Sequence, residues 1–141
     1  MPPKEVFLSH SSSDSVITDR LAATLRNHGV PVWYSATNIV GAQQWHDEIG
    51  KALKRCDWFI ILLSNDSIAS QWVKWELAYT LNHGQYRESI LPVTLDNCDY
   101  ETLSWTLGTF QMVDLQADFE SGCRGILRSW GIGLDIEKIE P

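Results

Sequence analysis

The segment from Asp57 to Ser64 (DWFIILLS) constrains the fold more than any other part of the chain. Its residues from Trp58 to Leu63 are all apolar, without alternation of apolar and polar side chains. A strand with one face in water alternates, whereas a strand covered by helices on both faces does not. The segment therefore predicts a buried strand of a parallel sheet. It is too short to cross a membrane, which takes about 20 apolar residues.

Strand-like and helix-like segments alternate along the rest of the chain, which is typical of the α/β class. We expect a flavodoxin-like sheet of five parallel strands in the order 2-1-3-4-5, with helices on both faces. The expected second strand contains Pro31, which suits the edge of a sheet. The other strands are expected at residues 5–9, 30–34, 89–95 and 109–115, and the helices at residues 12–28, 45–56, 67–82 and 119–130.

The charges are unevenly distributed. Eleven Lys and Arg residues against eighteen Asp and Glu residues give a net charge of -7. Residues 88–123 contain seven of the acidic residues and no Lys or Arg. This stretch predicts an acidic surface, either solvated or used to dock a basic partner. Because such a surface repels phosphates, we expect no direct binding of nucleic acid.

The cysteines and histidines indicate neither a disulfide framework nor a metal site. Cys56, Cys98 and Cys123 are odd in number and widely spaced, and the four histidines lie far from possible co-ligands. The first residues, MPPKEVFLSH, contain no apolar leader. Neither a GxGxxG nor a GxxxxGKS/T phosphate-binding loop occurs. We therefore expect a cytoplasmic protein without a membrane anchor, resident cofactor or metal.

The expected strand order also places a candidate site. Ligands of such sheets bind beyond the carboxyl ends of the strands, where the first and third strands meet. In this chain that edge corresponds to residues 9–14, the loop after Tyr34, and the stretch from Ser64 into the third helix.

Glu76 is the candidate catalytic residue in this region. It follows Trp72 by four residues, so the two side chains lie one above the other on the expected helix. Glu76 is about 60° from the apolar stripe of Val73, Leu77 and Leu81, at the edge of the buried face. Partial desolvation there should raise its pKa. Such a carboxylate can bind a ribose diol or stabilise an oxocarbenium-like centre; the alternative is a surface glutamate beside a boundary tryptophan.

Several segments, in order from about Lys4 to Gly131, resemble a TIR (Toll/interleukin-1 receptor) domain of the bacterial type. Residues 6–14 (VFLSHSSSD) resemble the first sequence motif of the family (box 1), and residues 70–77 (SQWVKWEL) resemble its most characteristic helix. The other matching segments are residues 29–34, Gly41 with Trp45, residues 57–64 and residues 91–93.

The resemblance implies roles for individual residues. Some TIR domains cleave the nicotinamide–ribose bond of NAD, and Glu76 matches their catalytic glutamate. NAD is then the substrate and not a cofactor. The substrate-binding residues implied are His10, Ser11, Ser35, Asn38 and Trp72.

Two positions depart from the pattern of catalytic members. Ser35 or Ala36 stands where many have an acidic residue, and Ser11 and Ser12 stand where some have arginine. No Lys or Arg lies between Ala36 and Gly50. The pyrophosphate of NAD would then be held by hydroxyls, by backbone N–H groups at the start of a helix, or by a neighbouring protomer.

The resemblance leads us to expect an NAD⁺ nucleosidase that yields nicotinamide and ADP-ribose, or a cyclic ADP-ribose, in bacterial anti-phage immunity. The alternative is a non-catalytic adaptor that binds other TIR domains. Residues 1–131 form the expected TIR domain. Residues 132–141 are expected to close no core and to be a tail, or the start of a linker to a sensor or oligomerisation domain beyond Pro141. Self-association with other TIR domains is expected for either function.

Overall fold

The structure is a computed structural model that describes residues 2–35 and 42–141, with residues 42–45 described by their backbone alone. Among the described residues, five strands form one sheet in the order β2-β1-β3-β4-β5, and all neighbours are parallel. The expected fold class and strand order are therefore confirmed. The strands are β1 (Val6–Ser9), β2 (Val32–Trp33), β3 (Trp58–Leu63), β4 (Ile90–Thr94) and β5 (Val113–Asp114).

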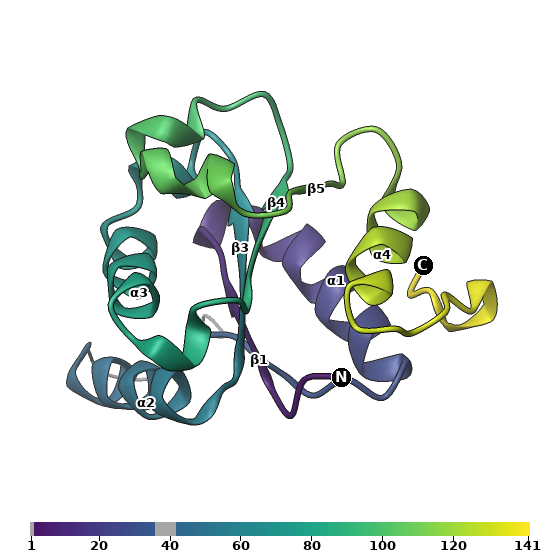
Figure 1. The fold of residues 1–141 in the computed structure, drawn as a ribbon, viewed down its shortest axis with the longest axis horizontal. Helices are drawn as coiled ribbons and strands as arrows, with labels where there is room; N and C mark the ends of the chain where they lie inside the picture. Colours follow the sequence, from purple (N-terminus) through teal and green to yellow (C-terminus); the bar gives the residue numbers. More distant parts are fainter. Residues whose placement is uncertain (1, 36–41) are drawn as a thin grey trace.

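Helices cover both faces of this sheet. They are α1 (Ser15–Asn27), α2 (Ala42–Arg55), α3 (Gln71–Leu81) and α4 (Phe119–Arg128). In Figure 1, α2 and α3 lie on one side of the strands, and α1 and α4 lie on the other. No helix within the described ranges is long and apolar enough to cross a membrane.

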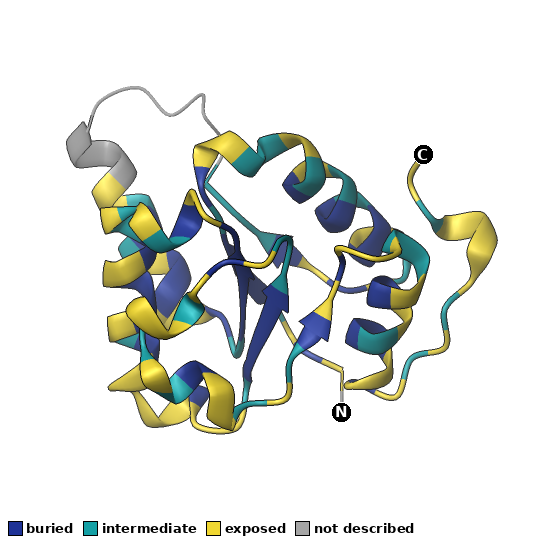
Figure 2. Cartoon of the chain, turned by 90° about the horizontal axis from the view of Figure 1, so that it is seen from above, coloured by how far each residue is buried: buried dark blue, intermediate teal, exposed yellow. Residues whose placement is uncertain are grey.

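The core consists of two apolar layers, one on each face of the sheet. Because side chains alternate along a strand, Leu8 and Ile60 pack with residues of α1 and α4, whereas Phe7 and Phe59 pack with residues of α2 and α3. β3 is buried from Phe59 to Leu63. Figure 2 shows the same pattern, with the strands and the inward helix faces in dark blue and the outer helix faces in yellow. The unbroken apolar run of β3 is thus explained by the helices that pack on both faces of the sheet.

The two edge strands are shorter than predicted. β2 comprises Val32–Trp33 and β5 comprises Val113–Asp114. Each pairs with one neighbour, so fewer of its backbone groups are held in a ladder. Thr109, the expected start of the fifth strand, instead ends the 3-10 helix Trp105–Thr109.

The helix that carries Glu76 starts later than predicted. Residues 67–69 form a separate 3-10 turn, and α3 begins at Gln71. Ser70 separates them because its backbone is extended (φ -81°, ψ 124°) and its side chain accepts a hydrogen bond from the N–H of Val73. This N-cap fixes where the helix begins, and with it the direction of every side chain that follows.

Residues 132–141 pack along α1, so the expectation that they close no core is wrong. The backbone N–H of Asp135 donates to Nε2 of His28 (3.0 Å), and that of Glu140 donates to Oγ1 of Thr24 (3.0 Å). Ile132 and Leu134 pack against the core layer on the α1 and α4 face. That this segment leads to a further domain stays a prediction.

Candidate active site

Polar side chains gather where β1 and β3 end. β1 ends at Ser9, which lies beside Ile61 of β3. Ser64 follows β3, and α3 begins shortly afterwards at Gln71. The candidate site is therefore at the predicted edge of the sheet, where the strands' carboxyl ends meet α3.

The Glu76 carboxyl group lies inside the protein against the end of β1. Glu76 is 5% exposed and Ser9 is 1% exposed. The Ser9 hydroxyl donates a hydrogen bond of 2.7 Å to Glu76 Oε1. Within the described part of the chain, this is the one hydrogen bond to the carboxyl group, and Oε2 accepts none.

Burial controls the ionisation of this group. Desolvation raises the pKa of Glu76 from 4.5 to about 7, and the hydrogen bond from Ser9 lowers that pKa in part. The sequence predicted the upward shift but placed Glu76 at the edge of the buried face, which is wrong. The buried face of α3 consists of Val73, Glu76, Leu77 and Thr80, whereas Leu81 is 39% exposed.

Trp72 and Glu76 line one pocket between α2 and α3. Its volume is about 220 Å³, and its walls are mainly apolar and aromatic. The rings of Trp72 and Trp75 meet at 84° with centroids 5.1 Å apart, and the His46 ring lies 6.1 Å from Trp72. Such walls suit a planar ring with one polar edge. The lining residues are His46, Ile49, Gly50, Leu53, Trp72, Trp75, Glu76 and Tyr79.

The other predicted substrate-binding residues have different environments. His10 is half-buried and packs edge-on against Tyr34 (5.7 Å between ring centroids), and burial lowers its pKa below 6.5. The hydroxyl of Ser11 accepts the N–H of Ser13 at 3.2 Å, so it caps the turn after β1. Ser35 is half-buried just after β2, and Asn38 lies outside the described residues.

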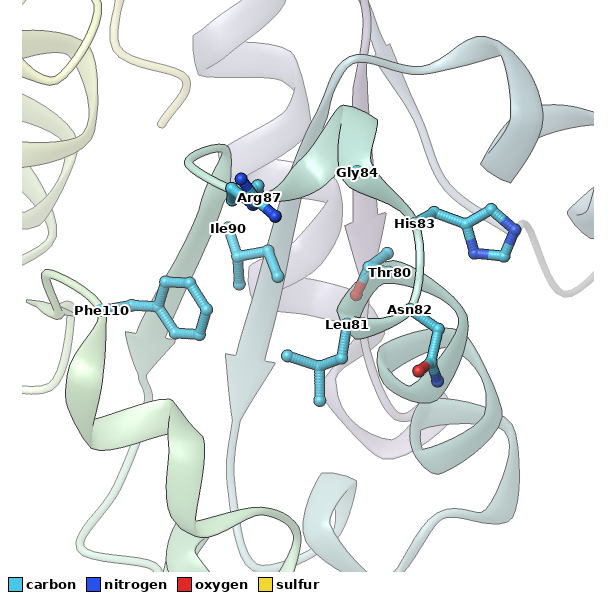
Figure 3. Close-up of a pocket in the computed structure, with 8 residues that line it drawn as sticks. All are labelled: Thr80, Leu81, Asn82, His83, Gly84, Arg87, Ile90 and Phe110. Atoms are coloured by element: carbon cyan, nitrogen blue, oxygen red, sulfur yellow. The ribbon is translucent and has the colours of Figure 1, made fainter.

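A second hollow lies at the other end of α3. Figure 3 shows Leu81, Ile90 and Phe110 around it, with Arg87 at its rim. Ile90 begins β4, so this hollow is at the amino-terminal edge of the sheet. Glu76 is not among its lining residues, and the hollow is separate from the candidate active site.

Metal ligands are not assembled anywhere in the part of the chain that the structure describes: no group of three or more His, Cys, Asp or Glu side chains could hold an ion there. The candidate site offers a carboxyl group, hydroxyls and aromatic rings.

A family model of the TIR domain matches residues 6–127. The chain belongs to the TIR domain family. Its fold agrees with solved TIR domains: the TIR domains of the activated Roq1 resistosome align with a TM-score of 0.71 at 18% identity, over 90% of this chain and 99% of that one. The TIR domain of the Toll-related receptor TRR-2 from Hydra magnipapillata aligns with a TM-score of 0.64 at 16% identity, over 88% of each chain.

Curated relatives of this TIR domain have names that describe enzymes. The 2′ cyclic ADP-D-ribose synthase AbTIR of Acinetobacter baumannii is 32% identical over 77 residues, which is 54% of this chain and 29% of that protein. The NAD(+) hydrolase PdTIR of Paracoccus denitrificans is 30% identical over 94 residues, which is 65% of this chain and 31% of that protein. The chain thus matches about a third of the length of each of these relatives.

The sequence placed Ser9 at the edge of the site but assigned it no contact with Glu76, and it did not single out His46 or Trp75. A serine at the end of the otherwise apolar run VFLS was the available signal for Ser9. His46 and Trp75 depend on how α2 packs against α3, and the sequence of this TIR domain carries no comparable signal for that packing.

Proposed function

We propose that this TIR domain cleaves the nicotinamide–ribose bond of NAD⁺ and that Glu76 is the catalytic carboxylate. The observation that carries the proposal is a buried carboxyl group beside an aromatic pocket, with one oxygen held by Ser9. The names of the relatives support the reaction class: NAD(+) hydrolase for PdTIR and 2′ cyclic ADP-D-ribose synthase for AbTIR.

The reaction needs a carboxylate more than a strong base. The bond between ribose C1′ and the nicotinamide nitrogen breaks, and its electron pair leaves with the nicotinamide, which becomes neutral. The positive charge passes to the ribose, where the Glu76 carboxylate stabilises it. Water then adds to C1′ and releases a proton to give ADP-ribose, or a hydroxyl of the same molecule adds and releases a proton to give a cyclic product.

The substrate is proposed to lie across the carboxyl edge of the sheet. Trp72 provides an aromatic wall for one of the two bases. His10 and Ser11, which follow β1, and Ser35, which follows β2, provide hydrogen-bonding groups for the ribose and pyrophosphate. The role of Asn38 in substrate binding stays a prediction from the sequence.

The test is to incubate the purified chain with NAD⁺ and to separate the products by chromatography. We expect nicotinamide together with ADP-ribose or a cyclic ADP-ribose, and Glu76→Gln should abolish nicotinamide release while it keeps the fold. Glu88→Gln, at an exposed position, is the matched control and should retain full activity. Equal nicotinamide release by the wild type and Glu76→Gln contradicts the assignment.

We also propose that the domain works by self-association as part of a larger cytoplasmic protein in anti-phage immunity. Trp75 is 54% exposed and Trp105 is 74% exposed, and exposed indoles are typical of protein contacts. Cleavage should then rise faster than linearly with protein concentration. A chain that self-associates but leaves NAD⁺ intact would instead support the adaptor function.

A further inference from the structure

The contact between Ser9 and Glu76 joins parts of the chain that are 67 residues apart. Ser9 ends β1, whereas Glu76 lies in the middle of α3. Both side chains are buried, so few other polar groups are available to the carboxyl group if this hydrogen bond is lost. A hydrogen bond to a buried charged group is also stronger than one between neutral groups.

We propose that Ser9 is a positioning residue for Glu76: its hydroxyl fixes Oε1, directs Oε2 toward the substrate ribose and favours the ionised carboxylate. This inference rests on the proposed function for the part that concerns NAD⁺, but the contact itself does not. The hydroxyl can only donate to an ionised carboxylate, which has no proton to give. Ser9 therefore favours the charged form against the desolvation that burial imposes.

The direction of the effect on ionisation follows from this geometry. Desolvation raises the pKa of Glu76 to about 7, and the Ser9 hydrogen bond opposes that rise. Ser9→Ala removes the opposing contact, so the pKa of Glu76 should move further upward, by about one unit. At pH 7 the ionised fraction then falls about fivefold, whereas at pH 9 it is nearly unchanged.

The first measurement uses no substrate. The Glu76 side-chain carboxyl carbon is titrated by NMR in ¹³C-labelled wild type and Ser9→Ala, with Glu76→Gln to assign the signal. The matched control is Thr80→Val, which removes another buried hydroxyl from α3; that hydroxyl bonds the carbonyl of Leu77 at 2.9 Å. We expect a higher midpoint in Ser9→Ala and the wild-type midpoint in Thr80→Val.

The second measurement is the pH profile of NAD⁺ cleavage. The acidic limb of kcat should move upward by about one pH unit in Ser9→Ala, with a larger loss at pH 7 than at pH 9 and little change in KM. Ser9→Cys, which replaces the hydroxyl with a slightly larger thiol that is a weaker donor, replaces Ser9→Ala in both measurements if the alanine variant does not fold.

The two proposals fail in different ways. If the wild type does not cleave NAD⁺, the proposed function fails, and the NMR titration still tests the contact. If Glu76→Gln is inactive while Ser9→Ala has the wild-type titration midpoint and pH profile, the function stands and the role of Ser9 is overturned. A loss of activity in Ser9→Ala that is equal at pH 7 and pH 9, without a change of midpoint, also overturns it.

Discussion

Asp14 Oδ2 accepts a hydrogen bond of 2.6 Å from the hydroxyl of Ser64. Asp14 lies in the turn after β1, and Ser64 directly follows β3. The contact thus joins the segments that follow β1 and β3 at the carboxyl edge of the sheet. The Ser64 hydroxyl also accepts the N–H of Ser67 at 3.0 Å, so one side chain joins three segments at the carboxyl edge of the sheet.

This contact predicts an energetic coupling between the two residues. Asp14→Ala and Ser64→Ala should each lower the free energy of unfolding, and the double variant should lose about 1 kcal/mol less than the sum of the single losses. Urea unfolding of the four proteins measures the coupling. Asp66→Ala, at an exposed position, combined with Ser64→Ala should be additive. Additive losses for the Asp14 and Ser64 pair would show that the contact contributes no stability.

The buried Glu76 predicts a stability that depends on pH. Since the pKa of Glu76 is raised from 4.5 to about 7 in the folded protein, the folded state holds this proton more tightly than the unfolded state. The stabilisation of the folded state by this bound proton is complete below about pH 4.5 and is lost as the pH rises through 7. Glu76→Gln, which is neutral, should therefore exceed the wild type in stability by up to about 3 kcal/mol above pH 8, with a smaller difference toward pH 4.5.

Urea unfolding of wild type and Glu76→Gln between pH 4.5 and 8.5 measures this difference. Glu101→Gln, at an exposed position, is the control and should follow the wild type at every pH. A Glu76→Gln curve parallel to that of the wild type would mean that the carboxyl group is ordinarily hydrated in the folded state.

Gly122 is required by the packing of α4 against the end of β5. A Cβ at this position would overlap Cδ2 of Leu115 and lie 2.8 Å from the carbonyl oxygen of Asp114. Gly122→Ala should lower the free energy of unfolding by about 2 kcal/mol because neighbouring atoms have to shift.

Gly125 is the matched control for this prediction. A Cβ at Gly125 comes no closer than 3.4 Å to Val113, and alanine favours the helix by about 1 kcal/mol. Thermal unfolding should therefore rank Gly125→Ala at or above the wild type and Gly122→Ala well below it. The reverse order would contradict the packing described for α4.

Trp72 is predicted to contribute to substrate binding more than to folding. Trp72→Phe keeps an aromatic ring in the pocket but reduces its area, so KM for NAD⁺ should rise about three- to tenfold with little change in kcat. Steady-state kinetics test this, with Glu88→Gln at an exposed position as the control. An unchanged KM together with a large loss of stability would make Trp72 a packing residue.

The fold was predictable because its strongest signals are local. The apolar run of β3 and the helical spacing after it set the order of strands and helices without any knowledge of contacts. The edge strands β2 and β5 were predicted too long because β-propensity cannot show how many residues pair with a neighbouring strand. The packing of residues 132–141 on α1 was not predictable, because it depends on hydrogen bonds from backbone groups such as the N–H of Asp135.

The sequence singled out residues of the candidate site, but it could not show their environment. The spacing of Trp72 and Glu76, with the family resemblance, made the Glu76 carboxyl group the candidate catalytic group. The burial of Glu76 was underestimated because a helical projection considers the helix alone, without the elements that pack against it. The burial depends on β1 ending in Ser9, whose hydroxyl makes a polar partner available inside the core.

A proton NMR time course of NAD⁺ with an equimolar amount of the purified chain tests most directly whether Glu76 carries the cleavage. We predict that free nicotinamide appears with wild type and with Glu88→Gln, faster when the protein is concentrated, and that it does not appear with folded Glu76→Gln. Nicotinamide release by Glu76→Gln at the wild-type rate would show that the buried carboxylate does not carry the reaction. Intact NAD⁺ with the concentrated wild type would contradict cleavage by this chain.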